Sequence, residues 1–114
     1  MEDMPGFPVR KRRDEARLRR VVDALRAYEP ESVYLFGFWA RGEADALSDL
    51  DPVIIKRTSD PFFDRLREVA RLLPADAGGV DILVYTPEEF RQMREERNAF
   101  AEMIEEEGVL IHGR

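Results

Sequence analysis

Two aspartates, Asp49 and Asp51, stand two positions apart in the sequence, and their spacing suggests metal chemistry. Side chains of an extended segment alternate between its two faces, so both carboxylates are expected on the same face. Carboxylate oxygens are hard ligands, and Mg²⁺ combines them with water and phosphate oxygens. The pair therefore predicts a site for a divalent cation that also faces phosphate.

Residues suited to the same site lie before and after this pair. Gly37 follows the apolar run 33–36, and a glycine there lets the backbone approach a phosphate group closely. Arg41 adds a positive charge in the same turn, and a third acid, Asp81, stands in the apolar run 80–85. Three acids on strands, a glycine turn and an arginine together indicate metal-assisted nucleotidyl transfer.

These residues also have the spacing of a known signature, and the segment 37–51 resembles that of the minimal nucleotidyltransferases of the polymerase-β-like superfamily. The signature is Gly-Ser, ten residues, Asp-x-Asp and a third acid on a later strand. This chain has Gly37-Phe38, ten residues, and then Asp49-Leu50-Asp51. The run 40–44, Ala-Arg-Gly-Glu-Ala, matches as well, and the resemblance covers nearly the whole chain. We therefore expect an α/β fold of the polymerase-β-like nucleotidyltransferase type, a small mixed β-sheet with helices packed mainly on one face.

The resemblance implies a role for each position. Asp49 and Asp51 would hold two Mg²⁺ (or Mn²⁺) ions on the triphosphate of an NTP, with ATP as the expected substrate. Asp81 would complete the second metal site and help to deprotonate the attacking hydroxyl. The implied reaction transfers a nucleoside monophosphate to a hydroxyl acceptor. The nucleotide-binding positions would be Gly37, Phe38, Arg41 and Ser48.

The resemblance also suggests where the acceptor comes from. A chain of 114 residues leaves little room for an acceptor-binding domain. Members of the family are often encoded beside an all-helical protein of the HEPN type. In such pairs the nucleotidyltransferase acts as the antitoxin, and some modify a tyrosine of the toxic HEPN ribonuclease. The expected partner is therefore a HEPN-type protein in a toxin–antitoxin system.

Two departures from the family pattern keep other functions open. Phe38 replaces the usual serine, so only its backbone N–H is available to a phosphate. Pro52 follows Asp51 directly, where the family continues an apolar strand, and proline removes a ladder donor. One alternative is a catalytically weak or inactive module that neutralises a partner by contact. Another is a nucleotidyltransferase that acts on a small hydroxylated molecule in a homodimer cleft.

Hydrophobic periodicity predicts the elements that would position this site. Apolar residues at 18, 21, 22 and 25 have helical spacing, and Pro30 ends that helix. A second helix is expected after Pro61. Strands are expected at 32–36, about 51–56 and 80–85.

The C-terminal part contains a further helix signal. Thr86 and Glu89 have the spacing of a capping box, so a helix is expected from there to Gly108. A short edge strand is expected at 109–111. Residues 1–13 are expected to be a flexible basic leader, and residues 14–114 one nucleotidyltransferase domain.

Composition excludes several other classes. The net charge of -6 argues against general affinity for nucleic acid. The chain has no cysteine, so a disulfide, a thiol nucleophile and a thiolate metal site are excluded. No apolar stretch approaches the ~20 residues of a membrane span, and no secretory signal is recognised. A cytoplasmic location is therefore expected.

Overall fold

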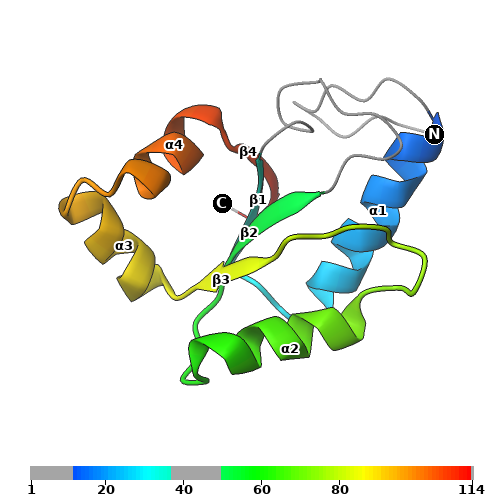
Figure 1. Cartoon of the computed structure of the whole chain (residues 1–114), viewed down its shortest axis with the longest axis horizontal. Helices are drawn as coiled ribbons and strands as arrows, with labels where there is room; N and C mark the ends of the chain where they lie inside the picture. Colours follow the sequence, from blue (N-terminus) through cyan, green and yellow to red (C-terminus); the bar gives the residue numbers. More distant parts are fainter. Residues whose placement is uncertain (1–11, 37–49, 114) are drawn as a thin grey trace.

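The computed structural model describes residues 12–36 and 50–113. The elements, in chain order, are α1 (Arg12–Arg26), β1 (Ser32–Phe36), β2 (Asp51–Ile55), α2 (Phe62–Leu72), β3 (Leu83–Tyr85), α3 (Pro87–Glu95), α4 (Ala99–Glu107) and β4 (Val109–Gly113) (Figure 1). None of the described helices is long and apolar enough to cross a membrane.

The strands form one mixed sheet in the order β3-β2-β1-β4. β1 pairs antiparallel with β2 and with β4, whereas β2 pairs parallel with β3. The expected edge strand after Gly108 is present and continues to Gly113. β3 is shorter than the predicted strand 80–85, although one isolated bridge pairs Leu50 with Val80 ahead of it.

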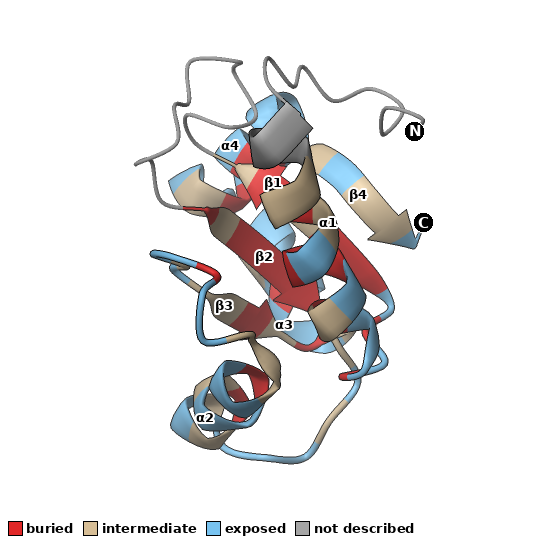
Figure 2. Cartoon of the chain, turned by 90° about the vertical axis from the view of Figure 1, so that its right-hand side faces the viewer, coloured by how far each residue is buried: buried red, intermediate tan, exposed pale blue. Residues whose placement is uncertain are grey.

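Helices cover both faces of this sheet (Figure 1). Helices α1 and α2 pack on one face, where Leu35 and Ile54 belong to the larger buried cluster. Helices α3 and α4 pack on the other face, around Val53 and Ile55. Figure 2 shows the buried residues concentrated on the central strands, β1 and β2. The α/β class and the small mixed sheet are confirmed. We expected the helices mainly on one face, and this part of the expectation is wrong. The central strands are apolar on both faces, so each face is covered by helices.

The predicted helix between Thr86 and Gly108 is divided in two. The capping box at Thr86 and Glu89 is present and starts α3. Arg97 then adopts a left-handed conformation with φ 55, which ends the helical path. Asn98 caps α4 by accepting hydrogen bonds from the backbone N–H groups of Phe100 and Ala101. The expectation of one helix is therefore wrong, and the turn between α3 and α4 brings α4 against β1.

Candidate metal and nucleotide site

Asp51 and Asp81 lie side by side at the start of two neighbouring parallel strands. Asp51 is the first residue of β2, and Asp81 comes two residues before β3. The register pairs Val53 with Leu83 and Leu50 with Val80, and the same offset pairs Asp51 with Asp81. Residues at the same level of adjacent strands point to the same face, so the two carboxylates share one face of the sheet.

Backbone hydrogen bonds fix this arrangement on either side of Leu50. The Leu50 N–H donates to the Gly79 carbonyl at 2.9 Å, and the Asp81 N–H donates to the Leu50 carbonyl at 2.8 Å. Pro52 cannot donate to the next carbonyl along this edge because it has no N–H. The regular ladder to β3 begins only at Val53. A proline is thus accommodated inside a central strand because it stands at a gap in the parallel ladder.

Both carboxylates line one cleft with a volume of ≈ 440 Å³. Asp81 is exposed and Asp51 is half-buried. The other described lining residues are apolar: Phe36, Pro52, Val53, Ile82, Leu83 and Phe100. The cleft therefore combines two acidic groups with an otherwise hydrophobic wall.

Two phenylalanines stand beside the acidic pair in this cleft. Phe36, the last residue of β1, is the register partner of Asp51. Phe100, in the first turn of α4, contacts the Phe36 ring edge to face, with ring centroids 5.8 Å apart and an interplanar angle of 75°. The sequence predicts only a strand residue and a helix residue at these positions. Asn98 is the sequence signal that could have located Phe100 in the site. Asparagine is a good N-cap, so it marks the start of a helix two residues before Phe100.

The remaining predicted site positions lie outside the described residues. These are Gly37, Phe38, Arg41, Ser48 and Asp49. Within the described ranges 12–36 and 50–113, no group of three or more histidine or acidic side chains could hold a metal ion. Asp51 and Asp81 are therefore the two predicted ligands that the structure places together.

The donor set of this pair fits magnesium in kind. Two carboxylates on one face supply hard oxygen ligands, and Mg²⁺ is commonly bound by one or two carboxylates together with substrate phosphates and water. The site has no sulfur ligand, because the chain contains no cysteine. Mg²⁺ or Mn²⁺ is thus the cation class that these residues would hold.

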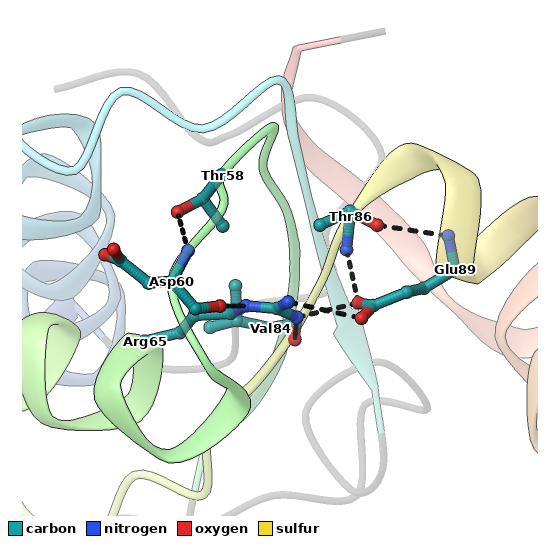
Figure 3. A network of polar contacts seen from close by, with 6 residues as sticks. All are labelled: Thr58, Asp60, Arg65, Val84, Thr86 and Glu89. Carbon is teal, nitrogen blue, oxygen red and sulfur yellow. Dashed lines mark hydrogen bonds and ion pairs between the residues drawn. The ribbon is translucent and has the colours of Figure 1, made fainter.

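A polar network at the other end of β3 fixes the helices that flank the sheet (Figure 3). Arg65 of α2 is 6% exposed. It forms two hydrogen bonds with the Glu89 carboxylate, 2.7 Å from Nη1 to Oε1 and 3.2 Å from Nη2 to Oε2. It also donates from Nε to the Asp60 carbonyl at 2.8 Å and from Nη1 to the Val84 carbonyl at 3.2 Å. Glu89 in turn accepts from the Thr86 N–H. This network ties α2, β3 and α3 together.

The same network shifts the acidity of its carboxylate. Hydrogen bonding from Arg65 is the largest influence, and with the Thr86 N–H it lowers the pKa of Glu89 below its ordinary value of 4.5. Sequence patterns do not reveal this network, because Arg65 and Glu89 are 24 residues apart. From the sequence alone, Arg65 is indistinguishable from the other charged residues of an amphipathic helix.

No family model matches this chain, and no curated protein matches it. Its fold, however, matches solved structures. A toxin–antitoxin structure solved with AMP-PNP matches with a TM-score of 0.61 and 19% identity, over 84% of this chain and 73% of that chain. A candidate nucleotidyltransferase from Sulfolobus solfataricus matches with a TM-score of 0.56 and 22% identity, over 93% of this chain and 91% of that chain. The chain therefore shares the fold of these two structures. Fold alone does not fix the substrate, so the activity is argued from the site.

Proposed function

We propose that this protein is a metal-dependent nucleotidyltransferase that transfers AMP from ATP to a hydroxyl acceptor. The observation that carries the proposal is the adjacency of Asp51 and Asp81 on parallel strands, facing one cleft. The fold shared with a candidate nucleotidyltransferase supports it. The shared fold of a toxin–antitoxin solved with AMP-PNP, an ATP analogue, supports a nucleotide as the ligand.

In this proposal the three aspartates, Asp49, Asp51 and Asp81, hold Mg²⁺ or Mn²⁺. The chemistry that the cation supplies when bound is neutralisation of charge on the triphosphate and on the pyrophosphate as it leaves. Gly37 and Arg41 orient the phosphates, together with the Phe38 backbone N–H and Ser48. Most of the rate enhancement comes from positioning and from neutralised charge.

Asp81 has a further role in proton transfer. It is exposed, and it lies two residues before β3, which is an edge strand of the sheet. An acceptor can therefore approach its carboxylate from outside the sheet. The acceptor oxygen attacks the α-phosphorus, the bond from phosphorus to the pyrophosphate oxygen breaks, and the hydroxyl proton passes to Asp81 or to solvent.

The acceptor is proposed to be a hydroxyl on a HEPN-type partner protein, and the chain would then serve as the antitoxin in the cytoplasm. One observation supports this assignment, because a structure with the same fold is a toxin–antitoxin.

Phe38 favours a second candidate function. It stands where the resembled family has serine, so one phosphate hydrogen bond from a side chain is missing. In this second candidate the chain neutralises its partner by contact, with little or no turnover.

One experiment separates the two functions. The chain is co-purified with its partner, incubated with Mg-ATP and examined by intact-mass spectrometry. Transfer predicts that the partner gains the mass of one adenylyl group. The double variant Asp51→Asn/Asp81→Asn should abolish this gain while leaving the complex intact, because asparagine keeps the shape but removes the charge that binds the cation.

Asp76→Asn is the matched control, because Asp76 is an exposed aspartate that does not line the cleft. It should transfer as the wild type does. A mass gain that survives in the double variant would overturn the mechanism. No gain in the wild type, with the partner still neutralised by the double variant, would establish the contact function instead.

A further inference from the structure

A single row of side chains crosses three neighbouring strands at the level of the two aspartates. Asp81 lies beside Asp51, and Asp51 is the register partner of Phe36. From the β3 edge inward the row therefore reads acid, acid, aromatic. Adjacent strands are about 4.8 Å apart, so Phe36 lies roughly 10 Å from the outer acid. The chemical character of the cleft thus changes from charged to aromatic along one direction.

Phe100 enlarges the aromatic end of this row. It contacts Phe36 edge to face, and both rings are half-buried and line the cleft. In an edge-to-face pair, the ring that presents its edge leaves both of its faces to other neighbours. Phe100 also packs at the margin of the cluster that holds α4 on the sheet, so the fold itself supports part of its ring.

We propose that Phe36 and Phe100 form the surface on which the nucleobase of the bound nucleotide lies. This inference rests on the proposed function, in which the aspartates face the phosphates. A nucleotide has a charged end and a flat aromatic end, and the row from Asp81 through Asp51 to Phe36 has the same two ends. Stacking of a base on aromatic side chains is a recurring source of affinity in nucleic-acid-binding proteins. The base assignment therefore uses two rings of the cleft that are not among the residues proposed to bind the phosphates or the cation.

Two ligands test the assignment, because one of them lacks the base. Mg-ATP and Mg-tripolyphosphate are titrated calorimetrically into the wild type and into Phe100→Ala. The wild type should bind ATP about tenfold or more tightly than tripolyphosphate, and Phe100→Ala should weaken ATP binding by about tenfold, in line with the loss of one stacked base. The affinity for tripolyphosphate should stay within about twofold of the wild-type value, since Phe100 is not among the residues proposed to bind the phosphates or the cation.

A second variant and a control guard against a loss of fold. Phe100→Leu keeps the apolar volume but removes the ring, so its ATP affinity should fall between those of the wild type and Phe100→Ala. Met103→Ala lies on the same helix, is exposed and does not line the cleft, so both affinities should stay at the wild-type values. Thermal melts of each variant accompany the titrations.

Three outcomes would overturn the inference, and they differ in what they imply for the proposed function. Equal loss of both ligands in Phe100→Ala and Phe100→Leu would mean that the ring supports the fold. Equal affinity of the wild type for ATP and tripolyphosphate would place the base elsewhere and leave the phosphate site standing. If the wild type binds neither ligand, the proposed function fails, and the base assignment fails with it.

Discussion

At the scale of single residues, Asp51 and Asp81 bring two like charges to the same level of neighbouring strands. Like charges directly opposite each other on neighbouring strands repel. Asp81 is exposed, so solvent screens part of this repulsion. A cation between the carboxylates would convert the repulsion into attraction. The repulsion between the two carboxylates should therefore lower the stability of the protein without metal, and a bound metal should reverse this contribution.

This change of sign can be tested with Asp81→Asn. Without ligand, the variant should be more stable than the wild type by a few tenths of a kcal/mol, because one of the two like charges is gone. With Mg-ATP at a hundredfold excess over its dissociation constant, the wild type should gain about 2.7 kcal/mol. Asp81→Asn should gain much less. Thermal and urea unfolding with and without Mg-ATP measure both effects.

Asp76→Asn serves again as the control, and it should keep the full ligand-dependent gain. A ligand-free Asp81→Asn protein that is less stable than the wild type would show that the Asp81 charge is favourable in the fold. If Asp81→Asn gained as much stability with Mg-ATP as the wild type does, Asp81 would not be a ligand of the metal.

How far the sequence predicts the site depends on how each residue reaches it. The acidic residues are predictable because strand alternation fixes the face of Asp51, and parallel pairing of two apolar runs brings Asp81 beside it. Phe100 is not predictable in this way. Its position depends on the direction of α4, which is set by a left-handed Arg97 and by the packing of α4 on the sheet. Asp49 and the predicted phosphate-binding positions lie in segment 37–49, outside the described residues. Their roles stay predictions.

At the scale of elements, the break between α3 and α4 depends on one backbone conformation. Arg97 has φ 55, a conformation that costs a residue with a Cβ roughly 1 kcal/mol and costs glycine almost nothing. Arg97→Gly should therefore stabilise the protein by up to about 1 kcal/mol, less any gain in entropy of the unfolded chain. Urea unfolding measures the change.

The same substitution at Arg91 is the matched control. Arg91 is exposed in the interior of α3, where glycine should destabilise by roughly 1 kcal/mol. Opposite signs at the two positions would confirm the left-handed turn. Destabilisation of similar size at both positions would contradict it and would favour one continuous helix.

A second property of the elements is the pH dependence given by the Arg65–Glu89 pair. Because Arg65 lowers the pKa of Glu89 below 4.5, the native state holds this proton less tightly than the unfolded chain does. The stability contributed by Glu89 is therefore fully present at a pH above the ordinary pKa of 4.5. It is lost as the pH falls through the lower pKa that Glu89 has in the native state. The Glu89 side chain is 45% exposed, which moderates the effect.

Glu89→Gln tests this contribution while retaining an oxygen acceptor for the capping box. At neutral pH the variant should be less stable than the wild type by about 1–2 kcal/mol, because Arg65 is buried and loses its charged partner. The difference should shrink as the pH is lowered below 4.5. Urea unfolding at neutral pH and at steps below that value provides the data. A difference that persists unchanged in acid would assign the effect to packing rather than to charge.

At the scale of the whole molecule, the sheet separates the end with the acidic cleft from the end with the Arg65–Glu89 network. The carboxylates lie at the start of β2 and beside the start of β3, whereas the Arg65–Glu89 network lies at the far end of β3. The apolar pattern predicted the strands that carry both ends, and the mixed sheet was expected from the family resemblance. It did not predict that helices cover both faces. Amphipathic helices have the same pattern whichever face they cover, and the choice is made by the direction of the connections.

This separation predicts that the two ends contribute independently to stability. From Asp81 to Thr86 the chain advances five residues, about 16 Å along the strand, and mutations farther apart than about 7–10 Å with no shared partner usually add within about 0.5 kcal/mol. The double variant Asp81→Asn/Glu89→Gln should therefore unfold with the sum of the two single effects. It should also lose the Mg-ATP gain to the same extent as Asp81→Asn alone. Urea unfolding of the wild type, the two single variants and the double variant provides this double-mutant cycle. A coupling energy above roughly 1 kcal/mol would show that β3 transmits strain between its ends, so that ligand binding at one end would depend on the polar network at the other.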